Sequence, residues 1–246
     1  METKRDISIV TIDKNRSLVI ACDVSGGIGP KSGDSLKVSG EVVGFFTTRV
    51  ALMEALSVGA EPISIVDTLS VEYDPSGKNI IKGITKAVKE IGLDPGRVIN
   101  GSTEDNINTF ETGVGVTVVA ITDNDSLKIN NSKNGNILAL IGMPLVGKEV
   151  LEKKDKIVDF SDLKILLEKN YINEILTVGS KGIKYEAELL ASMSSLKVEY
   201  NDSINIDLEK SAGPASAILI SLSENKVMNL KNDFAHRPIN IIGKLV

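Results

Sequence analysis

The side chains best suited to chemistry in this sequence are carboxylates that lie in apolar surroundings. Asp23 follows a β-branched run, Glu54 interrupts an apolar helical stretch, and Asp67 ends a short β-branched run. A carboxylate in such surroundings needs a partner, a proton or a cation. Acids held near a core by a helix and by strands therefore indicate a site for a metal ion and a nucleotide.

A glycine-rich segment comes directly after Asp23. Glycines allow backbone amides to approach a ligand closely, and this segment contains Gly26, Gly27 and Gly29. Lys31 would add a positive charge beside a phosphate, and Asp34 closes the loop. The segment is not a Walker A motif, because Pro30 stands where that motif requires glycine. An ordinary glycine-rich turn fits these residues equally well.

Two adjacent acids, Glu104 and Asp105, follow a predicted strand in the stretch Asn-Gly-Ser-Thr-Glu-Asp-Asn. Residues of these types also form exposed turns, and composition alone favours that interpretation. In a functional interpretation the two acids make a third acidic contribution to the cation site.

Two glycine-containing stretches in the second half could contact a ligand. Gly179, Ser180 and Lys181 lie in the first turn of a predicted helix, where free amides beside a lysine suit an anion or a polar ligand. The same residues also suit an ordinary tight turn. Residues 142–148 match the spacing of a P-loop, but the next residue is Glu149. A P-loop needs a hydroxyl there for Mg²⁺, and a carboxylate would repel phosphate.

The bulk composition excludes several classes of function. The chain has 246 residues, 42% of them hydrophobic, enough for one large domain or two small ones with real cores. A net charge of −5 and an aromatic content of 4% argue against a nucleic-acid partner. No apolar run is long enough to cross a bilayer, and the N-terminus lacks the apolar core of a signal peptide. We therefore expect a cytoplasmic protein with no membrane partner.

The chain has a single histidine and a single cysteine. His236 lies in a polar run, which favours an exposed loop residue over a catalytic one. Cys22 lies in an apolar strand, which predicts a buried structural thiol. An internal disulfide and a Cys/His zinc site are excluded. Carboxylates, glycines and lysines remain, and these suit electrostatic phosphoryl chemistry.

The elements that would position these side chains alternate between strands and helices. Apolar and β-branched runs predict strands over 6–12, 16–23, 63–67, 97–99, 113–122, 136–142 and 174–178. Helical spacing predicts helices over 41–58, 78–92 and 161–170, the last capped by Ser161. The polar stretch 123–135 reads as a linker or exposed hairpin between residues 1–122 and 136–246. The pattern indicates an α/β (α+β) protein with two subdomains.

At motif level, residues 5–122 resemble the aminoimidazole-ribonucleotide (AIR) synthase superfamily, also called PurM-like. The stretch 41–70 is similar to its core motif, a helix with an acid, a Gly-Ala-x-Pro corner and a strand. Glu54 takes the place of the helix aspartate, and Asp67 matches the acid that closes the strand. Asp23 and Lys31 match the acid and the lysine of the family's Asp-Gly-Val-Gly-Thr-Lys segment. Residues 99–106 fall where the family has a Gly-Gly-acid loop.

The resemblance implies a two-subdomain fold and a homodimer in which the N-terminal mixed sheets form a barrel across the interface. It also implies ATP held with Mg²⁺ by carboxylates. The metal ligands would be Asp23, Glu54, Glu104 and Asp105, of which Asp23, Glu54 and Asp105 would be catalytic. Further nucleotide contacts would come from Gly26, Gly27, Gly29, Lys31, Asp34, Asp67, Ser102 and Thr103. A nucleoside-like acceptor would be bound by Gly179, Ser180, Lys181, Ser211 and Gly213.

The chain is most similar to superfamily members that act as α-ribazole kinase, which phosphorylate the nucleoside of the cobalamin lower ligand. Asp23-Val24 departs from the paired aspartates usual in thiamine-monophosphate kinase, and the reactive N-terminal cysteine or selenocysteine of selenophosphate synthetase has no counterpart. We therefore expect an ATP-dependent kinase of a small nucleoside-like alcohol. The alternatives are a cyclo-ligase of the AIR synthase type, an enzyme like thiamine-monophosphate kinase, and a non-catalytic nucleotide-binding module.

Overall fold

A computed structural model describes residues 2–246, apart from the side chains of residues 2–4. The chain divides into two units, each built around its own sheet. The first comprises the residues up to Leu56 together with Ala60–Asp125, and the second comprises Ser57–Gly59 together with Ser126–Val246. Along the chain, the segment 123–135 separates the strands of the two sheets, and it contains the 3-10 turn η2 (Asn124–Ser126).

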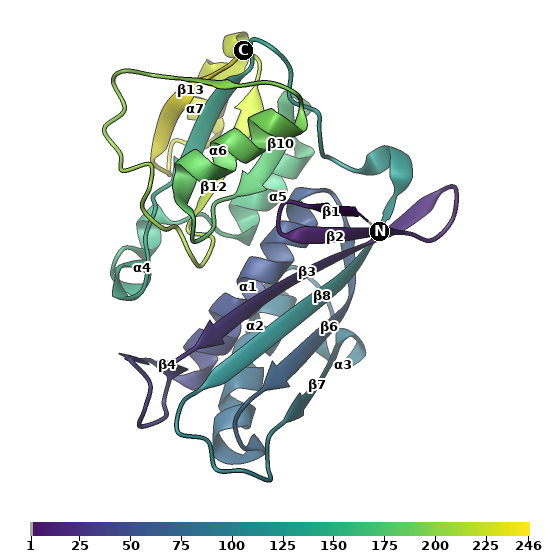
Figure 1. Ribbon diagram of the computed structural model, residues 1–246, viewed down its shortest axis with the longest axis vertical. Coiled ribbons are helices and arrows are strands. Elements are labelled where there is room, and N and C mark those ends of the chain that lie inside the picture. The colour runs from purple at the N-terminus through teal and green to yellow at the C-terminus, as the bar shows by residue number, and fades with distance from the viewer. Residues whose placement is uncertain (1) are drawn as a thin grey trace. The chain divides into compact units, whose positions relative to one another are not determined.

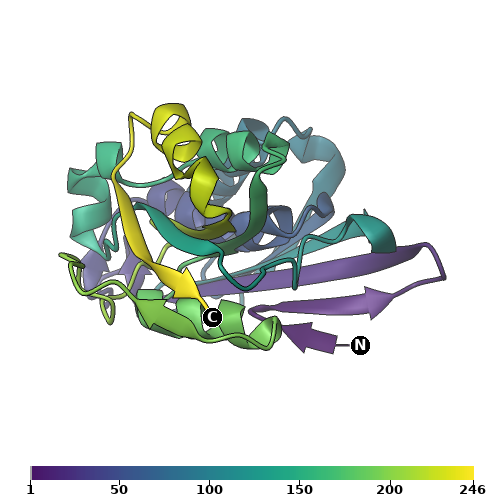
Figure 2. The same cartoon turned by 90° about the horizontal axis from the view of Figure 1, so that it is seen from above.

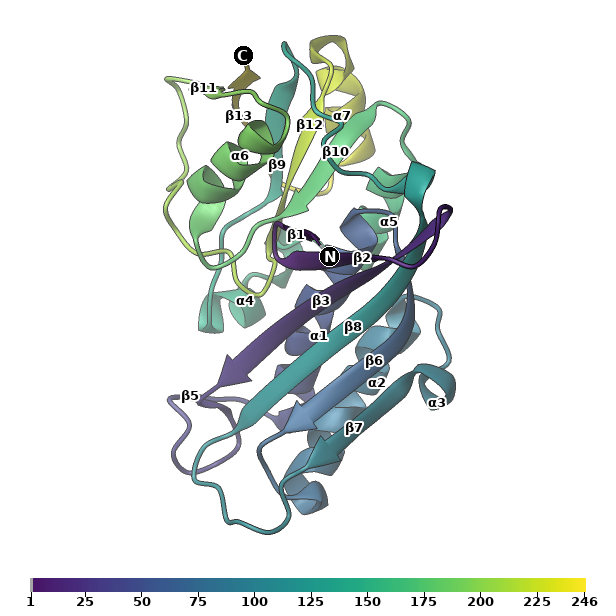
Figure 3. The ribbon, with the colours of Figure 1, turned by 45° about the vertical axis from the view of Figure 1, so that its right-hand side comes forward.

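The sheet of the first unit has six strands in the order β1-β2-β3-β8-β6-β7 (Figure 3). Its strands are β1 (Glu2–Lys4), β2 (Ile7–Thr11), β3 (Arg16–Gly26), β6 (Glu61–Leu69), β7 (Ile99–Thr103) and β8 (Gly113–Asp123). The pair β6–β7 is parallel, and the others are antiparallel. A hairpin joins β2 to β3, which lie side by side in Figure 2 (purple). Asp13 closes its turn by accepting a hydrogen bond from the amide of Asn15.

One face of this sheet is covered by two helices, α1 (Gly40–Ser57) and α2 (Lys78–Glu90), seen behind the strands in Figure 3. The alternation along β8 follows from this cover, since every second side chain from Val114 to Thr122 is buried. The two helices approach each other closely at glycines. A Cβ atom on Gly83 would lie 2.0 Å from the carbonyl oxygen of Glu41, so a larger residue there would push the helices apart.

Short elements complete the first unit. They are β4 (Ile28–Gly29) and β5 (Leu36–Lys37), which pair with each other, η1 (Tyr73–Gly77) and α3 (Pro95–Val98). Residues 97 and 98 thus belong to a short helix rather than to the strand predicted over 97–99. Strand β7 instead continues to Thr103, through residues that the sequence assigns to a loop.

The sheet of the second unit has five antiparallel strands in the order β10-β12-β9-β13-β11. They are β9 (Ile137–Gly142), β10 (Ile172–Thr177), β11 (Val198–Tyr200), β12 (Ala217–Leu222) and β13 (Ile239–Leu245). Helix α6 (Gly182–Met193) lies on one face, with α5 (Phe160–Glu168) and α7 (Val227–Asp233) on the other (Figure 1). The central strands β9 and β12 are therefore buried along their whole length. Three shorter helices are α4 (Lys148–Glu152), η3 (Lys154–Lys156) and η4 (Glu224–Lys226).

Two sequence-based predictions about single residues are wrong. Helix α5 is capped by Asp159 rather than by Ser161, because the Asp159 side chain accepts from the amides of Ser161 and Asp162 in a capping box. Cys22 is exposed rather than buried. It lies on the face of β3 that turns away from the helices, while its neighbour Ala21 fills the buried face.

Candidate functional site

Two carboxylates lie on one row across the sheet of the first unit. Asp23 in β3 and Asp67 in β6 are both paired with Val116, which lies on β8 between them. Directly opposed residues in a sheet point to the same face, so the three side chains share one face. The Cα atoms of the two acids are separated by two strand spacings, about 10 Å.

This row belongs to the face that the helices cover. Ser25, two residues beyond Asp23 on the same face, accepts a hydrogen bond of 2.8 Å from the hydroxyl of Thr47 in α1. Asp67 is only 2% exposed, and Asp23 is half-buried. The two acids therefore lie under the helical layer, where a bare charge costs free energy.

The row continues to Gly101 on β7, which is paired with Asp67. A Cβ atom on Gly101 would lie 2.3 to 2.4 Å from the carboxyl group of Asp67. The absence of a side chain on Gly101 therefore leaves the space that the Asp67 carboxylate occupies. Gly101, the glycine of the stretch Asn-Gly-Ser-Thr-Glu-Asp-Asn, thus makes room for the Asp67 carboxylate, although it contributes no acid itself.

Burial raises the pKa of both acids to about 6. For Asp67, burial outweighs a hydrogen bond from its own backbone amide, and for Asp23 the negative charge of Asp6 adds to burial. Among the side chains that the structure describes, no lysine or arginine contributes to the pKa of either group. Burial thus disfavours the charged form of each acid, and a bound cation would favour it.

The four predicted metal ligands do not form one cluster. Within residues 2–246 no three histidine, cysteine or acidic side chains are grouped closely enough to hold a metal ion. Glu104 accepts hydrogen bonds from the amides of Asn106 and Ile107 in its own loop. Asp105 accepts from the amide of Tyr73 and from the hydroxyl of Thr103. Of the four residues, Asp23 lies in the row with Asp67, and Glu54 is half-buried on α1.

The glycine-rich segment is held by Asp34, which is itself buried. Its carboxylate accepts three hydrogen bonds of 2.7 Å, from the amide of Lys31 and from the amide and hydroxyl of Thr112. The amide of Gly27 also donates to the carbonyl of Thr112, at 3.0 Å. Asp34 and the amide of Gly27 therefore shape the loop, and the nucleotide contacts predicted for them would compete with these bonds.

Lys31 is paired with an acid that the sequence analysis did not single out. Its ammonium group forms an ion pair with Glu72, and Glu72 also accepts a hydrogen bond of 2.5 Å from the hydroxyl of Ser76. Partial burial would raise the pKa of Glu72, but its bonds to Lys31 and Ser76 lower it to about 2. Glu72 lies in a turn after β6, and no spacing in the sequence connects it to Lys31.

The remaining predicted nucleotide contacts lie on three strands of two different sheets. Gly26 ends β3 and pairs with Gly113, Gly29 lies in β4, and Ser102 is an exposed residue of β7. Ser102 occupies the position at which the family motif has its third acid. Ser102 pairs with Thr68, so its hydroxyl lies on the face of the sheet opposite to Asp67.

The two predicted acceptor-binding segments of the second unit lie next to each other. The amide of Ala212 donates to the carbonyl of Gly179 at 3.1 Å, which joins the turn before α6 to the stretch 211–214. The amide of Gly213 donates to the hydroxyl of Ser211 at 3.2 Å. Lys181 lies over the ring of Tyr185, 4.2 Å from its centre, and Ser180 lies in the same turn.

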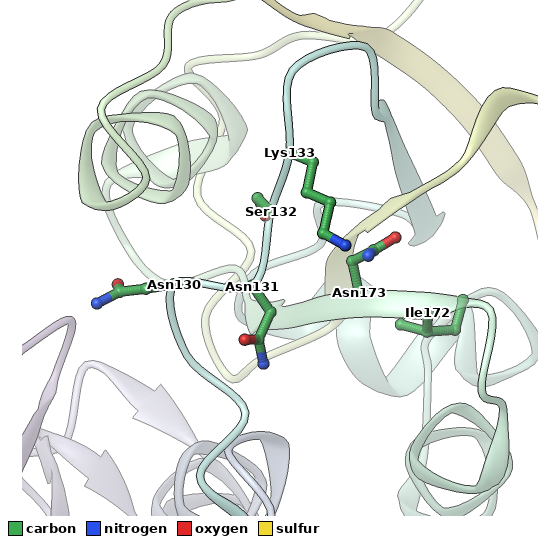
Figure 4. A pocket seen from close by; sticks show the side chains of 6 residues that line it. All are labelled: Asn130, Asn131, Ser132, Lys133, Ile172 and Asn173. Atoms are coloured by element: carbon green, nitrogen blue, oxygen red, sulfur yellow. The ribbon is translucent and has the colours of Figure 1, made fainter. Parts of the chain in front are cut away.

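Two other places in the second unit have features of a ligand site. In the P-loop-like stretch, Glu149 accepts from the amide of Val146 at 3.3 Å and pairs with Lys210 at 2.7 Å. A carboxylate thus lies where a phosphate would bind, in agreement with the sequence analysis. A polar hollow of about 370 Å³ is lined by Asn130, Asn131, Ser132, Lys133, Ile172 and Asn173 (Figure 4).

The family of the first unit follows from a direct comparison of sequences. Residues 4–122 match the family described as AIR synthase related protein, N-terminal domain. The first unit is therefore a domain of the AIR synthase superfamily, as the motifs around Asp23 and Asp67 suggested. No curated protein sequence matches the chain.

The fold of the chain is similar to solved structures of low sequence identity. PurL of Thermotoga maritima in complex with ADP has a TM-score of 0.67 and 15% identity, covering 100% of this chain and 42% of that one. Thiamine monophosphate kinase from Aquifex aeolicus has a TM-score of 0.66 and 14% identity, covering 98% and 88%. Thiamine-monophosphate kinase from Stenotrophomonas maltophilia has a TM-score of 0.64 and 14% identity, covering 98% of this chain and 89% of that one.

The chain spans 42% of the length of the PurL chain but most of the length of the kinases. At these identities the similarity establishes a PurM-like mixed α/β fold. Among the described residues, no helix is both long and apolar enough to cross a membrane.

Proposed function

We propose that this chain is an ATP- and Mg²⁺-dependent phosphotransferase that acts on a small nucleoside-like alcohol. The observation that carries the proposal is the row of Asp23 and Asp67, two carboxylates under a helical layer whose pKa values no described lysine or arginine lowers. The superfamily of the first unit and the nucleotide complexes of structural neighbours, such as PurL with ADP, support it.

The residues of the row fit a divalent cation. Mg²⁺ prefers carboxylate oxygens and usually keeps several waters, so two acids and a nucleotide would suffice as its partners. With their Cα atoms about 10 Å apart, Asp23 and Asp67 would hold one or two such ions, and bound waters would complete the ligands. When bound, the ion would offset the negative charge of the phosphoryl group that is transferred.

The rest of the machinery would position and screen the reactants. Lys31 would neutralise charge on the phosphate chain beside the glycine-rich loop, which Asp34 keeps in shape. The segments of Gly179 and Ser211–Pro214, which a hydrogen bond joins, would receive the acceptor, as the sequence resemblance implies. Phosphoryl transfer requires mainly such positioning and charge stabilisation.

For the acceptor we propose α-ribazole, on the sequence resemblance described above. Thiamine monophosphate, the substrate named for the kinase neighbours, and formylglycinamidine ribonucleotide are the two competing substrates to test. Each would give a product of distinct mass with ATP. A protein that binds Mg·ATP but converts none of the three would instead be a nucleotide-binding module.

The test compares wild-type protein with Asp67→Asn and Asp23→Asn, which keep shape and remove charge. We expect turnover of Mg·ATP with the acceptor to fall at least about a hundredfold in each variant, because a metal ligand is lost. Asp123→Asn, an exposed acid at the far end of β8, is the control and should keep wild-type turnover. Full activity of Asp67→Asn, or no binding of Mg·ATP by the wild type, would contradict the proposal.

We also propose that the chain forms a homodimer through the open face of the first sheet. Opposite α1 and α2, this face carries apolar side chains, among them Ile20, Val119 and Val24, the last of which is 76% exposed. Monomers seldom leave contiguous apolar surface uncovered. Sedimentation velocity checks this proposal, and Val24→Lys should shift the protein to the monomer if the face is the interface.

A further inference from the structure

Glu72 lies where three motifs of the first unit meet. It follows β6, the strand of Asp67, by three residues, and its carboxylate pairs with Lys31 of the glycine-rich loop. The next residue, Tyr73, donates its amide to Asp105 of the acidic loop at 2.8 Å. One short segment therefore connects the metal-binding row, the lysine and the third loop.

The contacts of Lys31 hold it at both its backbone and its side-chain end. Its amide donates to Asp34 at 2.7 Å, and its carbonyl accepts from the ammonium group of Lys37. Its own ammonium group reaches Glu72. A free lysine side chain loses rotamer entropy on being fixed, and here much of that loss precedes ligand binding.

The contacts of Glu72 fix the acid in turn. One oxygen accepts from the buried hydroxyl of Ser76, and the other pairs with Lys31. The carbonyl of Glu72 accepts from the amide of Gly77 at 2.9 Å. The acid is thus held by its own turn, independently of the lysine that it pairs with.

The ion pair leaves Lys31 able to bind a phosphate. An ammonium group has three donors, and Glu72 takes one of them. The Lys31 side chain is 19% exposed, so its remaining donors are within reach of a ligand in the loop. The geometry therefore fits a lysine that is oriented by its acid rather than blocked by it.

We propose that Glu72 is a positioning residue that holds Lys31 in place for the phosphate chain of the nucleotide. The inference rests on the proposed function and adds to it a residue that the nucleotide itself need not touch. Glu72 acts only through Lys31, so its effect on nucleotide binding must disappear when Lys31 is absent.

The test is a double-mutant cycle on the full chain, with Glu72→Gln, Lys31→Met and the combined variant. The dissociation constant of Mg·ATP is measured by calorimetry, with KM and kcat measured alongside. We expect Glu72→Gln to raise the dissociation constant and KM about tenfold while kcat changes little, because orientation and charge assistance are lost. In the Lys31→Met background, Glu72→Gln should have no further effect.

Two further variants separate positioning from a general effect on the fold. Ser76→Ala removes the bond that orients Glu72 and should raise the dissociation constant in the same direction by about two- to threefold. Asp74→Asn is the matched control, since it removes a nearby acid that pairs only with the exposed Lys78. It should leave both nucleotide binding and the thermal unfolding temperature unchanged.

The outcomes distinguish the two proposals. Two results would overturn the positioning role and leave the phosphotransferase proposal intact. One is tighter nucleotide binding by Glu72→Gln, and the other is an equal loss of nucleotide affinity on Glu72→Gln in the presence and in the absence of Lys31. A wild-type protein that binds no Mg·ATP would overturn both.

Discussion

Each unit of the chain buries an aspartate, and the two aspartates have opposite surroundings. Asp67 in the first unit is 2% exposed, and no cationic side chain affects its pKa. Asp162 in the second unit is fully buried, and it accepts from Arg237 Nε at 2.8 Å and lies 2.8 Å from His236 Nε2. The amide of Asp159 also donates to Asp162, at 2.9 Å.

The difference separates an acid that stabilises the fold from one that serves a ligand. Asp162 joins helix α5 to the segment before β13 through Arg237, which also pairs with Asp159 at 2.6 Å. Asp67 joins nothing within its unit and is costly while it is charged. A buried acid that a fold retains without a partner is a candidate for an external cation.

The largest expected effect is that of Asp67→Asn on function. Turnover of Mg·ATP should fall by about two to three orders of magnitude, since the variant removes a ligand from the row. At pH 7.5 the free variant should also be more stable than the wild type, by up to about 3 kcal/mol, because the cost of a desolvated charge is removed. Steady-state assays and urea unfolding check the two effects. A less stable Asp67→Asn would contradict the comparison.

Asp162→Asn should act in the opposite sense. It leaves Arg237, whose side chain is 11% exposed, beside an amide, and breaking a buried pair costs about 3–5 kcal/mol. We expect this loss in the urea unfolding transition of the second unit. Asp155→Asn, an exposed acid near the same cluster, should change that transition by no more than about 0.5 kcal/mol.

The pH dependence of stability is the third way to test the difference. The folded-state pKa values of Asp23 and Asp67, about 6, lie above the ordinary value of 3.8. The folded state then binds more protons than the unfolded state, so stability falls as the pH rises from about 4 to about 6. Each group costs up to about 3 kcal/mol above this window, and the half-exposed Asp23 costs less.

Unfolding experiments with and without Mg²⁺ check this dependence. Protons and Mg²⁺ compete for the same carboxylates, so stabilisation by Mg²⁺ should increase through pH 6 and level off above it. In Asp67→Asn the decline between pH 4 and 6 should shrink. If the first unit of the wild-type protein instead becomes more stable between pH 4 and 6, the carboxylates of the row must have a cationic partner within the protein.

The smallest effect is expected for His236→Ala. The histidine is half exposed and shares Asp162 with Arg237, so its loss should cost about 1 kcal/mol. Urea unfolding again measures it. A loss as large as that of Asp162→Asn would assign the stabilising role to His236 rather than to Arg237.

The sequence predicted elements well where the pattern is local. The apolar stretch 41–58 forms α1, and the alternation over 113–122 forms β8, because a buried helix and a half-buried strand have distinct periods. The exposure of Cys22 could also have been foreseen from the alternation along β3. Val19 and Ala21 point to the core, so Cys22, the next residue after Ala21, must point to the other face. Helix α7 was missed because Leu230 is its only buried residue.

The candidate site required information that no single segment contains. Asp67 ranked behind Glu104 and Asp105 in the sequence analysis, although it shares a row with Asp23. That row exists only because β3 and β6 both pair with β8 in register at Val116. The pair of Lys31 with Glu72 spans 41 residues and leaves no local pattern. Register and long-range ion pairs are properties of the assembled sheet.

The position of Cys22 makes it a natural labelling site. It is the only cysteine of the 246 residues, it is exposed, and it lies beside Asp23 on the opposite face of β3. A maleimide fluorophore would therefore attach at one defined place without any mutation. Slow labelling at high protein concentration, and faster labelling on dilution, would reveal a partner subunit seated on that face.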